Sequence, residues 1–366
     1  MQARTIIAAV AAILLTAGMV QATDVFNMDP GLTSLSFVTV GNPGNAPDVN
    51  LDFNGNPLGS VGYAYQMGQY DVTAAQYCQF LNAVATQSDP YGLYDPSMAL
   101  QPAPHGDVGC GIVQTGNPGN YSYYISSAGF TVNNGNFPVG SVTWGTAVRF
   151  CNWLTNGQPA TGVEDLTTTE NGSYYINGAM TNAALMAVTR NANARYVIPT
   201  ENEWYKAAYY DPTLNGGAGG YWRYPTRSNT TPDWVLSSTG TNNANYRLYP
   251  DYIYTDPTNY LTEVGTFAGS PGPYGTYDMG GDVWQWNEGI ISGDRRGLRG
   301  GSFENGDTMM LAENYGGNPP ETGYGGEGIG FRVVELPVPE PLTILALGMA
   351  IAGLGGYIRR RRGAVE

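Results

Sequence analysis

Three cysteines and one histidine are the residues of this chain that could carry out nucleophilic or redox chemistry. A reactive thiolate needs a neighbouring base or cation to lower its pKa, and His105 lies five residues before Cys110 in a segment rich in proline and glycine. Cys78 and Cys151 lie in apolar, helix-like contexts, where a small buried thiol is expected. At most one internal disulfide can form. We therefore expect none of the three cysteines to act as a nucleophile.

Carboxylates are the second group with chemical potential, and five glutamates are loose candidates for a pair of catalytic acids. Glycoside hydrolysis requires two carboxyl groups about 5–10 Å apart, and no sequence spacing brings any two of the five that close. The five are Glu201, Glu203, Glu288, Glu304 and Glu313. Glu203 follows Thr200 by three residues, which is the pattern of a helix capping box. Capping is therefore the simpler interpretation of Glu203.

The regular elements that must position these side chains are few and short. Capping-box patterns start one helix at Thr73 with Gln76 and another at Thr200 with Glu203. The apolar spacing after Thr73 predicts an amphipathic helix that packs with a second amphipathic helix into one core. The expected ranges are 61–70 and 195–199 for strands, and 144–154 and 204–209 for the second and third helices.

The composition indicates loops and strands rather than long helices. The 366 residues include 51 glycines, 24 prolines and 27 tyrosines, but only one lysine. Residues 156–194, rich in Thr, Asn, Gly and Ala, are predicted to form a surface insertion. Without Arg4, the four arginines near the C-terminus and Glu366, 11 basic and 29 acidic residues remain. So acidic a body is repelled by nucleic acid and anionic lipid, and it suits solubility outside the cell or cation binding.

The N-terminal segment carries a signal for export. Arg4 precedes an apolar run over residues 6–20, and small residues around Ala22 offer a cleavage point. A buried first helix is the alternative interpretation. The charge, the short apolar stretch and the small-residue exit together predict a signal peptide at residues 1–22.

The C-terminal segment carries a signal for the cell envelope. Residues 342–358 are uncharged and would form a helix of about 26 Å, just long enough to span a membrane, and the four arginines after it should stay cytoplasmic. An ordinary tail anchor is one interpretation. Pro339, Glu340 and Pro341 before the helix make the segment at 337–366 resemble a PEP-CTERM sorting tail. That resemblance implies recognition by an exosortase in a Gram-negative bacterium.

Six motifs of the body occur in the order found in the formylglycine-generating enzyme, or sulfatase-modifying factor, domain family. They are YDVTAAQY at 70–77, PV at 138–139 with VTW at 142–144 and AVRFCNW at 147–153, IPTENEW at 198–204, GTYDMGGDVWQW at 275–286, RGGSF at 299–303 and GFR at 330–332. The chain resembles this family from about residue 61 to residue 334. The resemblance implies an α+β fold: a single, irregular, loop-rich domain of the C-type-lectin-like type, stabilised by bound calcium. We place this domain at 61–336, after an N-terminal extension at 23–60.

The resemblance also implies the residues that hold calcium, which prefers oxygen ligands. One site would use side-chain oxygens of Asp278 and Gln285 with the carbonyl oxygens of Gly281 and Val283. A second would use Asn245 and the Tyr246 carbonyl, together with Asp256 and the Thr258 carbonyl. The family usually has a carboxylate where this chain has Gln285. Without calcium, Asp278 and Asp282 would cap a glycine-rich turn, as aspartates commonly do.

The oxidase chemistry of the family depends on two cysteines that this chain lacks. The family positions are occupied here by Asn305 and Met310. An amide cannot form a thiolate, and a thioether alone replaces paired thiolates poorly, so no copper site and no formylglycine generation are expected. A single histidine also excludes the histidine-held iron of other relatives.

Binding is therefore the function we expect, with glycan or a surface protein as the ligand. Trp222, Arg223 and Tyr224 are the predicted surface contacts, because aromatic faces beside polar groups suit sugar rings or peptides. Arg295, Arg296 and Arg299 could meet an acidic ligand, although salt bridges within so acidic a protein are the simpler expectation. An enzyme of the same fold and a structural surface-layer component are the alternatives. We expect the protein to be exported to the envelope, cell surface or extracellular matrix.

Overall fold

The computed structural model describes residues 33–103, 108–323 and 328–337. The predicted signal peptide, the residues Pro339, Glu340 and Pro341, the predicted helix at 342–358 and His105 lie outside these ranges. No helix within the described part is long and apolar enough to cross a membrane.

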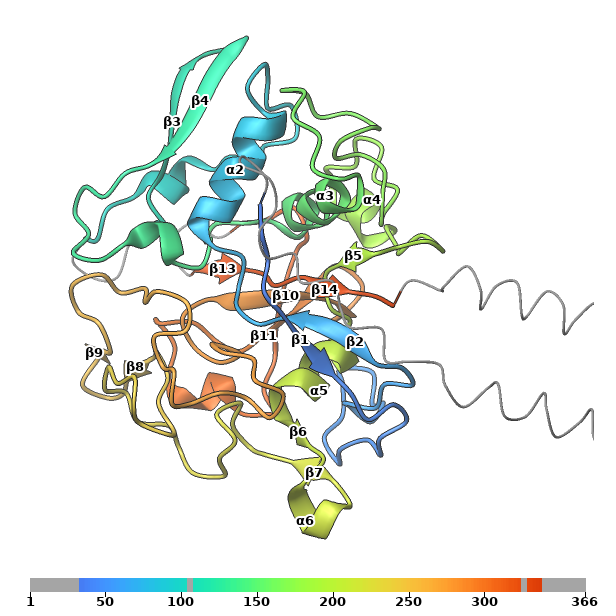
Figure 1. The fold of residues 1–366 in the computed structure, drawn as a ribbon, viewed down its shortest axis with the longest axis vertical. Helices are drawn as coiled ribbons and strands as arrows, with labels where there is room; N and C mark the ends of the chain where they lie inside the picture. The colour runs from blue at the N-terminus through green and yellow to red at the C-terminus, as the bar shows by residue number, and fades with distance from the viewer. Residues whose placement is uncertain (1–32, 104–107, 324–327, 338–366) are drawn as a thin grey trace, which may run out of the picture.

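Two four-stranded sheets form the centre of the molecule (Figure 1). The first has the order β1-β2-β14-β5 and the second the order β12-β11-β10-β13. All pairs are antiparallel except β10 with β13. The bounds are β1 Phe37–Val40, β2 Tyr65–Gly68, β5 Tyr196–Val197, β10 Trp284–Ile290, β11 Arg296–Arg299, β12 Gly316–Asn318, β13 Ile329–Gly330 and β14 Val334–Glu335.

Strands β13 and β14 follow one another closely in the chain but belong to different sheets. The residues between them, which include Arg332, therefore connect the edge strand β13 of the second sheet to the inner strand β14 of the first.

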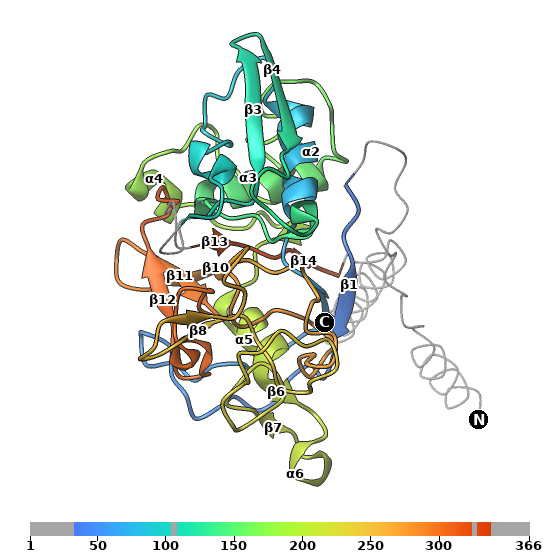
Figure 2. The same cartoon turned by 90° about the vertical axis from the view of Figure 1, so that its left-hand side faces the viewer.

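Helices and hairpins cover the sheets from both sides. In Figures 1 and 2, α2, α3, α4 and the β3–β4 hairpin lie on one side, and α5, α6 and the pairs β6–β7 and β8–β9 lie on the other. The bounds are α2 Ala74–Val84, α3 Trp144–Thr155, α4 Asn182–Met186, α5 Glu201–Tyr209, α6 Leu214–Gly217, β3 Ile112–Asn117, β4 Asn120–Ile125, β6 Tyr210–Asp211, β7 Gly220–Tyr221, β8 Arg247–Leu248 and β9 Ile253–Tyr254. Three single turns of 3-10 helix are η1 Pro96–Ala99, η2 Asn134–Asn136 and η3 Asp307–Met310.

The three helices expected from the sequence are present, and each begins with a threonine cap. Thr73, Thr143 and Thr200 all form capping boxes with the residue three positions later. Helices α2 and α3 pack together through aromatic rings, as predicted. Phe80 lies edge-on to Phe150, with ring centroids 5.3 Å apart. The strands expected at 61–70 and 195–199 are shorter than predicted, because only residues that pair across the sheet keep strand geometry.

Residues 156–194 differ from the expected surface insertion. The Glu170 carboxylate is buried and accepts a hydrogen bond of 2.6 Å from Arg149 of α3. The Asn152 amide of the same helix bonds the carbonyl oxygens of Thr169 and Tyr174. Part of the segment therefore packs against the core, because its polar residues satisfy buried polar groups of α3.

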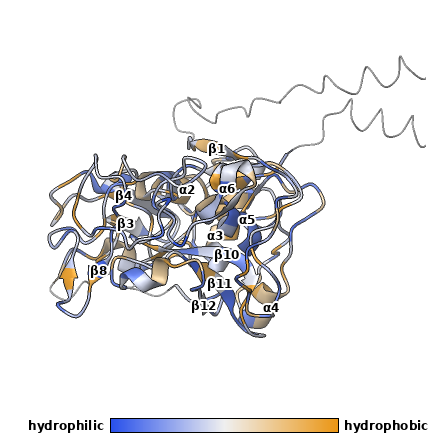
Figure 3. Ribbon diagram, turned by 90° about the horizontal axis from the view of Figure 1, so that it is seen from below, coloured by the Kyte–Doolittle hydropathy of each residue, from blue (hydrophilic) through white to orange (hydrophobic). Residues whose placement is uncertain are grey.

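The N-terminal extension at 23–60 is also more integrated than expected. Strand β1, which is hydrophobic in Figure 3, pairs with β2 along its whole length. Leu35 just before it and Leu58 further on belong to the main core. The described part of the extension is thus a component of the domain.

Candidate functional site

Arg332 is the centre of a buried polar network between the two sheets. Its Nε donates to Gln285 Oε1 at 2.8 Å, and its Nη2 donates to Asp71 Oδ2 at 3.0 Å. The remaining donors reach the carbonyl oxygens of Gly68 and Tyr277, each at 2.9 Å. Arg332 and Asp71 are both shielded from solvent. Because β2, β10 and the loop before β10 all contribute acceptors, this guanidinium joins elements of both sheets.

Three aspartates lie in this region: Asp71 and Asp282 are buried, and Asp278 is partly exposed. Burial raises the pKa of Asp71 to about 7, although Arg332 opposes the shift. Burial likewise raises the pKa of Asp278 to about 6. Burial and the neighbouring Asp278 carboxylate raise the pKa of Asp282 well above its usual range. The region therefore holds more potential negative charge than its one guanidinium neutralises, which favours a further cation or protons.

The residues of the first predicted calcium site lie together but are engaged with the protein. Asp278 Oδ2 accepts a hydrogen bond of 2.6 Å from the Gly265 amide. The Gln285 oxygen accepts from Trp204 at 2.7 Å and from Arg332, and its nitrogen donates to the Asp278 carbonyl at 2.7 Å. If the Gln285 amide were flipped, its nitrogen would face the N–H groups of Trp204 and Arg332, which are also donors. The orientation with the oxygen toward them is therefore fixed. Gln285 thus does not fit as a cation ligand in this arrangement.

The residues of the second predicted site offer a better fit. Asn245 is buried, and its nitrogen donates to Asp282 Oδ1 and the Tyr260 carbonyl, whereas its oxygen has no hydrogen-bond partner. An unpartnered buried amide oxygen is a suitable ligand for a hard cation. Gly281 lies directly beside Asn245, since a Cβ added to Gly281 would lie 2.1 Å from the backbone carbonyl oxygen of Asn245. The two predicted sites are therefore neighbours, and Asn245 is the member with a free ligand atom.

The other residues of both sets have different surroundings. Asp256 caps its own turn by accepting from the Thr258 and Asn259 amides, each at 2.9 Å. The Tyr246 carbonyl accepts from the Thr255 hydroxyl at 2.9 Å, and Val283 is buried in an apolar cluster. These contacts leave the carbonyl oxygens able to accept a second partner, because each carries two lone pairs.

Asn305 and Met310, at which the resemblance to the family led us to expect the oxidase cysteines to be replaced, are packed as structural residues. The Asn305 side-chain oxygen accepts from the Ser302 amide at 2.9 Å and from the Ser302 hydroxyl at 3.0 Å, which closes the loop. Met310 is fully buried in a small apolar cluster with Tyr224 and Tyr246. Neither side chain is available for redox chemistry.

The three cysteines are free buried thiols, as expected from their contexts. Burial raises the pKa of Cys78 to about 11 and raises those of Cys110 and Cys151 as well. At neutral pH all three are protonated, so none has the thiolate character that nucleophilic attack requires.

A group of tyrosines lies over the loop that contains Asn305. We call Arg247, Tyr249, Tyr252 and Tyr254 the tyrosine platform. The Arg247 guanidinium lies 5.0, 5.1 and 5.5 Å from the three ring centroids in that order. Tyr249 is 45% exposed and Tyr252 is 60% exposed. The Arg247 amide donates to the Asn305 carbonyl at 2.8 Å, which fixes the platform to the loop.

The predicted surface contacts at 222–224 are only partly exposed. Tyr224 is buried, and its hydroxyl bonds Thr231 and Asp307, so it cannot contact a ligand as predicted. Trp222 donates to Asp211 at 3.1 Å and is half-buried, whereas Arg223 is exposed beside Glu313. Side chains alternate in direction along an extended chain, so Arg223 points outward while Trp222 and Tyr224 point inward.

Two of the five candidate acids do meet, but on an arginine rather than at a cleft. Arg190 donates to Glu203 at 2.7 Å and to Glu288 at 2.9 Å. Although burial raises the pKa of Glu203, Arg190 opposes this and leaves it lowered, whereas burial dominates at Glu288 and raises its pKa. Glu203 also closes the Thr200 capping box, as predicted. The pair is structural, because the Arg190 guanidinium binds both carboxylates within the fold.

The remaining candidate charges are also engaged in the fold. Glu201 pairs with Arg299 at 2.7 Å. Arg296 donates to three carbonyl oxygens around α4 and stacks on Trp144, and Arg295 donates to the Gly317 carbonyl. The expected salt bridge therefore forms at one of the three clustered arginines, and backbone carbonyls bind the other two. The Glu304 carbonyl accepts from Tyr249 at the tyrosine platform.

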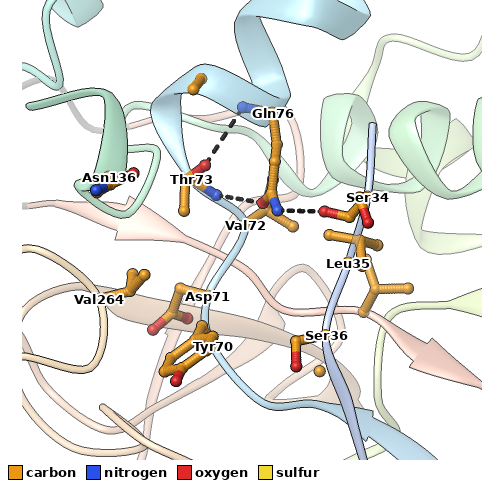
Figure 4. A pocket seen from close by; sticks show the side chains of 13 residues that line it. Ser34, Leu35, Ser36, Tyr70, Asp71, Val72, Thr73, Gln76, Asn136 and Val264 are labelled. Carbon is orange, nitrogen blue, oxygen red and sulfur yellow. Dashed lines mark hydrogen bonds between the residues drawn. The ribbon is translucent and has the colours of Figure 1, made fainter. Parts of the chain in front are cut away.

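A pocket of about 320 Å³ opens beside the Arg332 network (Figure 4). Asp71, Tyr70 and Val264 lie on one side of it, and Leu35 and Ser36 on the other. The pocket is separate from the tyrosine platform, which contributes none of its lining residues.

The comparison with family models decides the identity of this domain. The model of the Sulfatase-modifying factor enzyme 1-like domain matches residues 45–336. The chain belongs to this family. The match begins before the predicted start at residue 61, in agreement with the packing of the N-terminal extension. The fold is the mixed α+β, loop-rich, single-domain C-type-lectin-like fold of the family, as the sequence motifs implied.

Solved structures with this fold share little sequence with this family member. Treponema denticola variable protein 1 is 20% identical with a TM-score of 0.48, and 83% of this chain and 96% of that chain are covered. CarF is 18% identical with a TM-score of 0.47, covering 83% and 98%. PvdO from Pseudomonas aeruginosa is 16% identical with a TM-score of 0.41, covering 82% and 92%. No curated protein matches the chain.

The tyrosine platform is the feature that sequence reasoning missed. The segment 246–254 reads YRLYPDYIY, so a lone arginine among four tyrosines within nine residues was the available signal. Its significance depends on β8 and β9 pairing into a hairpin, which brings Arg247 opposite Tyr254.

Proposed function

We propose that this protein is an exported binding module of the cell envelope that recognises polysaccharide through the tyrosine platform. The observation that carries the proposal is the pair of exposed rings, Tyr249 and Tyr252, held by Arg247 over the loop of Asn305. Tyrosine supplies large contact area with few rotatable bonds, and both tyrosine and arginine are frequent among the residues that dominate binding. Exposed rings on a fixed guanidinium are therefore preorganised for a ligand.

The surroundings of the family's cysteine positions support binding over oxidation. Asn305 closes a loop, Met310 is buried, and the cysteines are protonated thiols. Formylglycine generation on the family pattern has no thiolate pair at these positions to carry it.

Calcium is the cofactor that we propose for this module. Asn245 would bind it through its unpartnered oxygen, with the Tyr246 carbonyl, Asp256 and the Thr258 carbonyl as neighbouring oxygen donors. The ion would supply positive charge beside Asp282 and fix the loops that converge on Asn245. The site of Asp278, Gly281, Val283 and Gln285 would require the Gln285 amide to leave Trp204 and Arg332.

The localisation part of the proposal depends on the two ends of the chain. Residues 1–22 would direct export, and Pro339, Glu340 and Pro341 would be recognised by an exosortase while the helix at 342–358 holds the precursor in the membrane. The mature module would then act at the surface or in the extracellular matrix, where its acidity keeps it soluble.

A direct test is affinity electrophoresis in gels that contain extracellular polysaccharide from a producing bacterium. We expect the protein to be retarded and the double variant Tyr249→Ala/Tyr252→Ala to migrate freely. The matched control is Tyr124→Ala/Tyr175→Ala, which removes two rings that are 48% and 56% exposed elsewhere. Equal retardation of the two double variants would contradict the proposal. So would a wild-type protein that is not retarded by acidic, neutral or amino-sugar polymers.

The enzymatic alternative is tested by mass spectrometry of a Cys-x-Pro-x-Arg peptide. We expect no conversion after incubation with the protein, oxygen, reductant, calcium and copper. Conversion would contradict the binding proposal, and replacing Cys78, Cys110 and Cys151 one at a time would locate the reactive thiol.

A further inference from the structure

The pocket beside the Arg332 network is a site that the proposed polysaccharide recognition does not use. Its lining comes from five separate parts of the chain: the segment before β1, the stretch from the end of β2 into α2, Asn136, Val264 and Val333. Figure 4 shows Asp71 between Tyr70 and Val264, below the start of α2. A pocket built from distant segments is fixed by the fold and is therefore preformed.

Asp71 gives this pocket an unsatisfied acceptor. Its Oδ2 accepts from Arg332 at 3.0 Å, but its Oδ1 is buried and has no hydrogen-bond partner. The side chain is fully shielded from bulk solvent. Leaving a buried carboxylate oxygen unpaired is costly, so a ligand that donates a hydrogen bond here gains that free energy on binding.

The charge around Asp71 favours a cationic donor over a neutral one. Asp278 and Asp282 lie close enough for Asp71 to interact with them electrostatically, and Arg332 is the guanidinium that faces the group. A positive ligand group would reduce the repulsion between these carboxylates.

The small number of carboxylates in the pocket argues against a metal ion. The carbonyl oxygens of Ser34, Ser36 and Gly68 accept hydrogen bonds from Gln76, Gln69 and Arg332, respectively, and each keeps a second lone pair. A calcium ion requires six to eight oxygens, with carboxylates prominent among them, and Asp71 is the one carboxylate in the lining. An ammonium group needs only one strong acceptor and two ordinary ones.

The rest of the wall is largely apolar, with Leu35, Val72, Val264 and Val333 among its members. We propose that this pocket binds a small primary alkylammonium compound, with its ammonium group on Asp71 Oδ1 and its alkyl chain against the apolar wall. The site is independent of the tyrosine platform, so failure of one proposal leaves the other standing.

The first test compares three ligands with one alkyl chain and different head groups. Isothermal titration calorimetry of the full chain at pH 8 would use n-hexylamine, n-hexanol and hexanoate. We expect saturable binding of the amine and at least tenfold weaker binding of the other two. Equal binding of hexanol, or no binding of hexylamine at millimolar concentration, overturns the proposal. A further titration would use N-acetyl-lysine methylamide, which mimics a lysine residue of a protein. If it binds more tightly than hexylamine, the natural ligand is a lysine side chain rather than a free amine.

The second test fills the pocket without changing its charge. Val264→Trp should abolish hexylamine binding, whereas Val235→Trp, at a valine that is 50% exposed elsewhere, should leave it unchanged. Asp71→Asn should weaken binding at least tenfold, and circular dichroism would show whether it folds. Because Val264→Trp preserves the Asp71–Arg332 pair, its result decides the matter even when Asp71→Asn is unfolded. Undiminished binding by Val264→Trp overturns the proposal.

Discussion

Arg332 and Arg247 use the same guanidinium group in opposite environments. Arg332 is fully buried and donates to a carboxylate, an amide and backbone carbonyls from both sheets. Arg247 lies near the surface among three tyrosine rings, two of them well exposed. The difference indicates that Arg332 maintains the fold. Arg247 instead organises the tyrosine platform, whose exposed side chains are not needed for folding.

The largest expected effect is at the buried arginine. Arg332→Met leaves Asp71 buried without its ion-pair partner, so we expect the free energy of unfolding to fall by about 3–5 kcal/mol. Urea denaturation measures this change. The matched control is Arg223→Met, which breaks an exposed pair with Glu313 and should cost less than about 1 kcal/mol. Similar losses in the two variants would remove the distinction between a buried and a surface arginine.

Calcium tests whether the acidic region beside Arg332 needs a second cation. A ligand present at 100 times its dissociation constant stabilises the folded state by about 2.7 kcal/mol. We expect calcium to raise the melting temperature of the wild type and of Asn152→Ala, in which a buried amide of α3 is lost. Asn245→Ala should lose the calcium increment, because its free oxygen is gone. An increment that survives in Asn245→Ala would place any calcium elsewhere.

Glu164 shows what happens to a buried acid that has no ion pair like that of Asp71. No donor reaches either of its oxygens, and burial, the charge of Asp89 and a hydrogen bond that the protonated carboxyl makes with Asp89 raise its pKa to about 9. Between pH 5 and pH 9 the folded state then holds a proton that the unfolded state has released. Stability should therefore fall as the pH rises through this window, by up to about 1.4 kcal/mol per pH unit.

The variant Glu164→Gln isolates this effect. It should flatten the pH dependence of urea denaturation, whereas Glu313→Gln, at a half-exposed surface residue, should keep the slope of the wild type. A slope that is unchanged in Glu164→Gln would show that another group titrates.

The smallest expected effect on stability is at the tyrosine platform. Tyr252→Ala removes a ring that is 60% exposed, and surface substitutions of this kind usually change stability by less than about 0.5 kcal/mol. Thermal denaturation checks this, and the affinity gel described above measures the loss of binding. A large destabilisation would mean that the platform supports the fold, contrary to its contrast with Arg332.

Local patterns predicted the local structure of this chain well. The caps at Thr73 and Thr200 are confirmed, because a capping box depends on residues three positions apart. The family motifs predicted the fold, and Trp204, Trp284 and Trp286 within these motifs are buried.

Contacts between distant residues could not be predicted in the same way. Asp71 and Arg332 are separated by 261 positions, and neither residue alone indicates its partner. The burial of Glu170 depends on Arg149, and the burial of Tyr224 depends on which way an irregular loop turns. The engagement of Gln285 by two donors follows from the packing of Trp204 and Arg332 around it. In each case the deciding interaction is long-range.

The crossing from β13 to β14 has a mechanical consequence. A molecule held by its C-terminal end would transmit tension to β14 through the chain that follows this strand. Strand β14 lies between β2 and β5 rather than at an edge, and Arg332 just before it connects to β10. A pulling force would thus load the interior of the domain first. Resistance to such a force would then depend on the rate at which β14 detaches from β2 and β5, and not on the equilibrium stability of the outer loops.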